Sequence, residues 1–261
     1  FADEGDKIMP ALKDVTKTGP LIDIEQEGIR HMLWRLINPL AIKTIQDAMR
    51  DKDIFIADGH HRYEVAVQYR DEMREKVHRR TNSGYDYVMM YFSPLNDDGL
   101  TILSTHRVIK KIGMDIEQFL GKLEECFCIK PFRSDKSLFR EMAFVKKGEY
   151  AFGMRHKNGK FYLLKLKEEC NLDTAIKEDK SREWKRLDVS ILHGLVLDNI
   201  LGLRERIQAE DNIIYTRDPY YAISEVSNGN CELAFFLNPT KVTQVQAIAK
   251  NRDRMPHKST Y

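Results

Sequence analysis

The run DGHHR at residues 58–62 gathers the side chains with the most chemistry in this sequence. The apolar residues 54–57 (IFIA) precede it and an amphipathic pattern over 61–79 follows, which predicts a strand, a turn and a helix. The first N–H groups of a helix lack intrahelical partners and the helix dipole is positive there, so such a junction can bind an anion. Gly59 would permit a tight turn and close approach of a ligand. The run therefore predicts a phosphate-binding site.

Each side chain in this run has an expected role. His60, His61 and Arg62 would donate to phosphate oxygens, with Arg62 suited to bidentate contact. Asp58, at the predicted carboxyl end of a strand, could hold a metal, orient a histidine or act as a general base. Glu64, in the first helical turn, could also act as a base. We predict catalysis by Asp58, Glu64 and His60, and phosphate binding by the residues from Gly59 to Arg62.

Two alternatives remain for the same run. The simplest is a helix cap followed by two solvent-facing histidines. Three residues that can carry positive charge oppose the helix dipole, which favours acids at this end, so a bound anion is favoured. The other alternative is a metal site, but adjacent histidines point in different directions on a helix and rarely chelate one ion alone. We predict no metal held by protein ligands alone.

The elements that would position these residues follow from periodicity and turn residues. The hairpin around Asn158-Gly159 is the strongest local signal. Residues 168–185 are charged and predict a connection or a solvated helix. Helices are predicted at 6–17, 39–50, 61–79, 115–127, 134–147, 188–201, 219–227 and 240–250, and strands at 21–36 (a hairpin), 54–58, 85–92, 100–112, 149–155, 160–167, 212–216 and 231–237.

This alternation predicts an α/β or α+β fold with mixed sheets and packed helices. A core at 19–112 would be followed by a second α/β subdomain at 113–261.

The chain has 261 residues, of which 42% are hydrophobic, enough for a real core. Its Lys+Arg count of 42 nearly equals its Asp+Glu count of 40, which makes nucleic acid an unexpected partner. No apolar run is long enough to span a membrane. Four cysteines without a CxxC pair predict free thiols in a cytoplasmic protein.

Several segments together resemble a known prokaryotic family. They are IADGHHRYEVAVQYRDE, GYDYVMMYF, LSTHRVI, LDVSILHGLVL, CELAFFLNPTKV and MPHKSTY. The chain is identified by them, over essentially its whole length, as a member of the domain-of-unknown-function 1015 family. Members of that family are longer at the N-terminus, so we expect this chain to be a fragment. The family resemblance implies no established activity.

The run at 58–62 is also similar to the nucleotide-binding turn of the ParB/sulfiredoxin superfamily. Free-serine kinases carry a near-identical run in that turn. The similarity implies that Gly59, His60, His61 and Arg62 hold nucleotide phosphates, and that Asp58 and Glu64 handle a metal or a proton. The absence of a cysteine in the turn argues against sulfiredoxin chemistry.

Further polar residues in the family segments are candidate ligands. Thr105 and Arg107 share one face of a predicted strand, where they would either reach a phosphate or face solvent. Lys258 lies in a non-periodic tail, whose composition alone predicts disorder. The family pattern instead favours a contact between Lys258 and a phosphate. His193 is predicted to be a core histidine and Asp188 a helix cap.

These residues predict a protein that binds a nucleotide, ATP or ADP with Mg²⁺. The expected activity is phosphoryl transfer to a small hydroxyl-bearing metabolite, a small-molecule kinase reaction. The alternative is a non-catalytic module, either a nucleotide-gated switch or a partner-binding protein.

Overall fold

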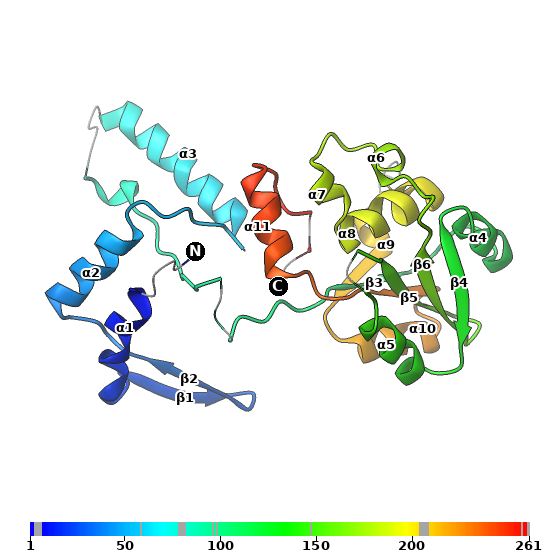
Figure 1. Cartoon of the computed structure of the whole chain (residues 1–261), viewed down its shortest axis with the longest axis horizontal. Helices are drawn as coiled ribbons and strands as arrows, with labels where there is room; N and C mark the ends of the chain where they lie inside the picture. The colour runs from blue at the N-terminus through cyan, green and yellow to red at the C-terminus, as the bar shows by residue number, and fades with distance from the viewer. Residues whose placement is uncertain are drawn as a thin grey trace. The chain divides into compact units, whose positions relative to one another are not determined.

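Two units, Phe1–Thr101 and Ile102–Tyr261, make up the chain in the computed structural model (Figure 1). The structure describes residues 1–2, 7–57, 59–77, 82–95, 97, 99–146, 148–203, 209–256 and 258–259. Residues 102–112, predicted to end the first part of the chain, lie in the second unit.

The first unit contains short helices and one hairpin. Its elements are α1 (Ile8–Lys13), η1 (Val15–Lys17), β1 (Ile22–Gln26), β2 (Ile29–Leu33), α2 (Pro39–Met49), α3 (His60–Val77) and η2 (Gly84–Asp86). Helix α2 begins as predicted, because the Asn38 side chain accepts from the Leu40 and Ala41 N–H groups at 2.9 and 3.2 Å. The antiparallel β1–β2 hairpin is also confirmed.

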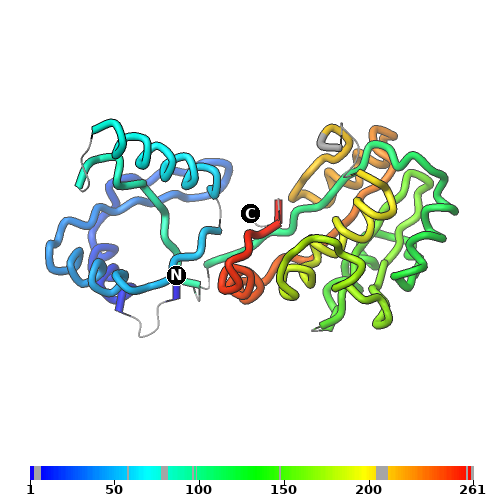
Figure 2. The backbone as a smooth tube through the Cα atoms, turned by 90° about the horizontal axis from the view of Figure 1, so that it is seen from above, coloured from blue at the N-terminus to red at the C-terminus, as the bar shows by residue number. Residues whose placement is uncertain are grey.

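Two strands predicted in the first unit are wrong. Residues 54–57 have no strand pairing, and Asp58 lies outside the described residues. The segment predicted as a strand at 85–92 instead starts within η2 and continues as chain without regular structure, as Figure 2 shows. Met89 and Tyr91 are 98% and 94% exposed. An apolar run becomes a strand only when a neighbouring strand takes its backbone hydrogen bonds, and none does so among the described residues.

The second unit is built on a six-stranded sheet with the order β4-β6-β5-β8-β3-β7. Every pairing between its described strands is antiparallel. The mixed pairing expected for part of the chain is therefore not observed in the described residues, and the sheet favours the α+β alternative. Its strands are β3 (His106–Ile109), β4 (Phe127–Phe132), β5 (Ala151–His156), β6 (Phe161–Leu166), β7 (Ile213–Thr216) and β8 (Leu233–Phe236).

Helices cover both faces of this sheet, so the predicted combination of sheets and packed helices is confirmed (Figure 1). One apolar core contains α4 (Ile116–Leu123), α8 (Asp188–Ile191) and the π-helix η3 (Leu192–Ile200). The other core contains α5 (Asp135–Ala143) and α10 (Pro219–Ser227). The remaining helices are α6 (Leu172–Ala175), α7 (Arg182–Lys185), α9 (Ala209–Asn212) and α11 (Val242–Lys250).

A disulfide joins Cys126 and Cys170, whose Cα atoms are 5.3 Å apart. The prediction of free thiols is wrong for this pair and holds for Cys128 and Cys231. The antiparallel pairing of β4 with β6 explains the contact, since it places the start of one strand beside the end of the other. The hydrogen bond from the Lys167 N–H to the Cys126 carbonyl, 2.9 Å long, continues that pairing.

Among the described residues, we find no helix with the length and apolar character needed to cross a membrane.

Candidate functional site

The predicted phosphate turn lies at the start of α3, in the first unit. The helix begins at His60, and the Tyr63 N–H donates to the Gly59 carbonyl at 3.0 Å. Gly59 has a φ of 81°, a left-handed conformation that side chains other than glycine's rarely adopt. The sequence expectation of a glycine turn opening a helix is thus confirmed.

The Arg62 side chain folds back over Gly59. A Cβ atom added to Gly59 would lie 2.9 Å from Nη2 and 3.0 Å from Nε of Arg62. A side chain at this position would therefore displace the guanidinium, which lies at the end of a flexible, exposed side chain. The result places a cationic, multidentate donor beside the first turn of the helix, where the dipole is positive.

His61, in the first turn of α3, lies next to Glu64, one turn further along the helix. The distance from His61 Nδ1 to Glu64 Oε2 is 3.6 Å, and the two side chains are 87% and 39% exposed. The contact places a carboxylate close to the glycine turn.

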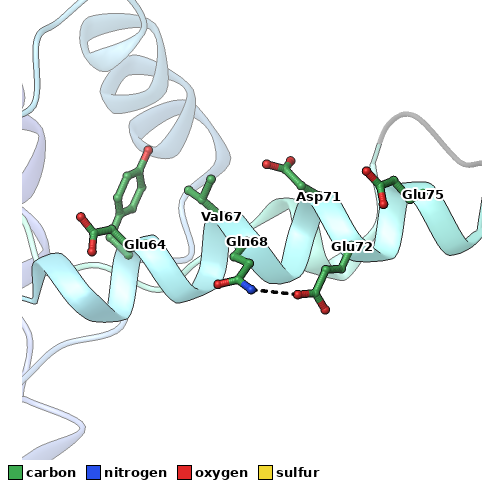
Figure 3. Close-up of a pocket in the computed structure, with 7 residues that line it drawn as sticks. Glu64, Val67, Gln68, Asp71, Glu72 and Glu75 are labelled. Atoms are coloured by element: carbon green, nitrogen blue, oxygen red, sulfur yellow. Dashed lines mark hydrogen bonds between the residues drawn. The ribbon is translucent and has the colours of Figure 1, made fainter.

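An acidic groove runs along α3 from this point (Figure 3). Its volume is about 510 Å³. Gln68 donates to Glu72 across one helical turn at 3.0 Å. The residues lining it are Tyr63, Glu64, Val67, Gln68, Asp71, Glu72 and Glu75. Four of these side chains are carboxylates, whose negative charge opposes the binding of an anion along this groove. Within the described ranges, no group of three or more His, Cys, Asp or Glu side chains is arranged to hold a metal ion.

The far end of α3 is held in place by Asp86. One Asp86 oxygen accepts from Arg74 Nε and Nη2 at 3.0 and 2.6 Å, and the other accepts from the Ser83 N–H at 2.9 Å. The Ser83 hydrogen bond, with the help of Arg74, lowers the pKa of Asp86. This contact fixes the helix that carries the turn against η2.

The other predicted ligands, Thr105, Arg107 and Lys258, come together in the second unit. Arg107 is fully buried. Its Nη1 donates to the Thr105 carbonyl, and its Nη2 donates to the Lys258 carbonyl at 3.1 Å. Burial of both residues contradicts the solvent-facing alternative for the Thr105–Arg107 pair, and their contact with a ligand stays a prediction. The predicted ligands therefore fall into two groups, one in each unit.

The Tyr215 ring completes the surroundings of Arg107. Arg107 and Tyr215 are register partners on β3 and β7. The Arg107 guanidinium carbon lies 5.5 Å from the ring centroid, and Lys258 Nζ lies 5.9 Å from it. Two cations thus share one aromatic ring, an arrangement that stabilises positive charge. Tyr215 lies in a correctly predicted strand, but periodicity alone does not indicate this contact.

His193 also contacts this cluster, although the sequence predicted a core histidine. Its Nε2 atom accepts a hydrogen bond from Arg107 Nε at 3.2 Å. An accepting Nε2 requires the neutral form with the proton on Nδ1. His193 lies on η3, a π-helix of nine residues, and such distortions often mark functional positions. The π-helical geometry has no local sequence signal that could have indicated this role.

Comparison with protein families places the chain in a family. It belongs to the family described as "Protein of unknown function (DUF1015)", whose model matches residues 1–190. The family membership predicted from the sequence motifs is confirmed. The ParB/sulfiredoxin-like character of the turn stays a prediction. No curated protein matches the chain.

Solved structures that are similar to this chain match it at low identity and low TM-score. One is a conserved hypothetical protein from Pyrococcus furiosus, with 15% identity, a TM-score of 0.40, and coverage of 98% of this chain and 82% of that one. Another is a free serine kinase in complex with AMP, with 14% identity and a TM-score of 0.40. That match covers 98% of this chain and 79% of the kinase chain.

Proposed function

We propose that the turn from Gly59 to Arg62 binds the phosphates of a nucleotide, ATP or ADP. The observation that supports this most is the Arg62 guanidinium held over Gly59 at the start of an 18-residue helix. Backbone N–H groups and the helix dipole favour an anion at that position. Within α3 itself, Glu64 lies beyond the first turn, which contains no acidic residue.

Phosphoryl transfer to a small hydroxyl-bearing metabolite is the reaction that such a turn would serve. The hydroxyl oxygen would attack the terminal phosphorus as its proton passes to Glu64, and the shortened nucleotide would leave. His60 and Arg62 would neutralise the charge that develops on the phosphoryl oxygens. Asp58 is a second candidate base or a Mg²⁺ contact. Mg²⁺, carried by the nucleotide, would neutralise part of the phosphate charge.

Isothermal titration with ATP, ADP and CTP, with and without Mg²⁺, tests nucleotide binding. Arg62→Ala should weaken binding about 10-fold or more, because a bidentate charge-assisted contact is lost. Arg70→Ala is the matched control, since Arg70 lies on the same helix and pairs with Asp71 at 2.8 Å. Failure of the wild-type chain to bind any of the three nucleotides would overturn the proposal.

A non-catalytic, partner-binding module is the second candidate. It is favoured by the exposed apolar side chains between Tyr87 and Phe92, since such patches often contact partners. Glu64→Gln separates the two candidates. If Glu64→Gln keeps the nucleotide affinity of the wild type but loses turnover, the protein is an enzyme. If neither the wild type nor Glu64→Gln shows turnover and both bind the nucleotide equally, the non-catalytic module is supported.

A further inference from the structure

Arg107 is a buried cation without a carboxylate partner among the described residues. Its side chain is 0% exposed. Its described hydrogen-bond partners are neutral: the His193 ring and the carbonyls of Thr105 and Lys258. A buried charge is costly unless an opposite charge compensates it. Burial lowers the pKa of Arg107 to about 10, which fits an uncompensated guanidinium.

Two hydroxyl groups beside Arg107 also lack partners within the described part of the chain. Thr105 and Ser259 are 5% and 4% exposed, and neither Oγ1 of Thr105 nor Oγ of Ser259 has a hydrogen-bond partner there. Thr105 directly precedes β3, and Ser259 follows Lys258, whose carbonyl accepts from Arg107. Unsatisfied buried hydroxyls are uncommon in folded proteins, so these two groups are available to contact a ligand.

The donors that remain at this cluster match one phosphate group. Three of the five Arg107 N–H groups are used within the described residues, which leaves one on each terminal nitrogen for bidentate contact. The hydroxyls of Thr105 and Ser259 add two donors, and the Lys258 ammonium adds a charge over the same Tyr215 ring.

We propose that Arg107, Thr105, Lys258 and Ser259 form a binding site for a phosphate group in the second unit. This site is additional to the turn at the start of α3, and the inference does not depend on nucleotide binding there. The ligand class is inorganic phosphate or the phosphoryl group of a small metabolite. His193 positions Arg107 by accepting from Nε, so it acts through the arginine.

Titration of the whole chain with inorganic phosphate at constant ionic strength tests the site. Thr105→Val removes one hydroxyl with little change of shape, and Lys258→Gln removes the exposed cation. Each should weaken phosphate binding about 5-fold to 10-fold, because one hydrogen bond or one charge contact is lost. Lys250→Gln, an exposed lysine at the end of α11, is the matched control and should bind like the wild type. Circular dichroism confirms that each variant folds.

Repeating the titrations in an Arg62→Ala background separates this site from the turn at α3. Persistent phosphate binding that Thr105→Val and Lys258→Gln weaken supports the proposal, whatever happens to nucleotide binding. Loss of all phosphate binding on Arg62→Ala alone would overturn it. Wild-type affinity in both variants, or no saturable binding at millimolar phosphate, would also overturn it. Acetate binding equal to phosphate binding would overturn the assignment to phosphate.

Discussion

At the scale of single residues, burial of ionisable groups controls how the second unit responds to pH. Burial raises the pKa of Asp188 to about 7, with Lys241 opposing the shift. Burial lowers the pKa of His106 to about 4, and the charge of Arg107 lowers it further. The two shifts have opposite consequences for the pH dependence of stability.

Asp188→Asn should make the chain more stable at alkaline pH. Between the unfolded pKa of roughly 4 and the folded pKa of about 7, Asp188 is protonated when folded and ionised when unfolded. The unfolded state then binds fewer protons, so the free energy of unfolding falls as pH rises through this window. Calorimetry should give Asp188→Asn a higher melting temperature than the wild type at neutral and alkaline pH. The difference in melting temperature should become smaller as the pH is lowered.

Asp179→Asn, at an exposed aspartate, is the control and should leave the pH profile unchanged. His106 acts in the other direction, because stability is lost as pH falls from the unfolded histidine value toward about 4. That effect is common to the wild type and Asp188→Asn, so it cancels in their difference. A difference in melting temperature that does not change with pH would contradict the role of Asp188.

At the scale of elements, two glycines allow close approaches that a methyl group would block. Gly59 places the Arg62 guanidinium at the start of α3, and Gly153 lets α5 approach β5. In β5, an added Cβ would lie 2.7 Å from Met142 Sδ and 3.2 Å from Phe236 Cβ. The sheet and its covering helix therefore meet at a position with no side chain.

Gly59→Ala should impair the candidate phosphate turn. An alanine at φ 81° is strained and its Cβ would displace the Arg62 guanidinium. We expect a stability loss of about 1–2 kcal/mol, from the left-handed conformation, together with weaker nucleotide binding. Urea unfolding and titration measure the two effects. Gly84→Ala is the control, because no heavy atom lies within 4 Å of the added Cβ. Equal nucleotide affinity in Gly59→Ala and the wild type would contradict the prediction.

Gly153→Ala should destabilise the second unit by about 1–3 kcal/mol, because overpacking forces Met142 and Leu138 to move. The midpoint of chemical unfolding measures this loss. Gly121→Ala, within α4, meets nothing within 4 Å and should be neutral or stabilising, since alanine favours helix. Equal stability of the Gly153→Ala variant and the wild type would show that α5 does not pack as described.

At the scale of the whole molecule, the Cys126–Cys170 disulfide closes a loop of 44 residues within the second unit. Closing a loop of this length lowers the conformational entropy of the unfolded chain, which raises the free energy of unfolding by up to about 4 kcal/mol. Cys126→Ser, or reduction of the wild type, should therefore lower the melting temperature of the second unit. Differential scanning calorimetry measures this melting temperature. Cys128→Ser, which changes an exposed free cysteine, is the control and should have little effect. An equal effect of both substitutions would contradict this role.

The family and the helices could be predicted from the sequence because their signals are local. Helix α10 begins and ends at the predicted residues, with Asp218 accepting from the Tyr220 N–H at 2.8 Å. The hairpin of β5 and β6 follows from Asn158-Gly159. The bounds of β4 cannot be predicted in the same way, because Lys130 and Pro131 interrupt its apolar pattern at the edge of the sheet. Predicted strands at 54–57 and 85–92 were wrong, since a strand depends on a partner elsewhere in the chain.

The glycine turn at the start of α3 and its row of basic side chains can be predicted from local sequence, because the start of a helix depends on neighbours within a few positions. The burial of Arg107 among His193, Tyr215 and the carbonyl of Lys258, which is 151 residues away in sequence, follows only from tertiary packing. Strand pairing and the return of the C-terminal segment bring these groups together, and neither has a local signal. The candidate phosphate site in the second unit is a property of that packing.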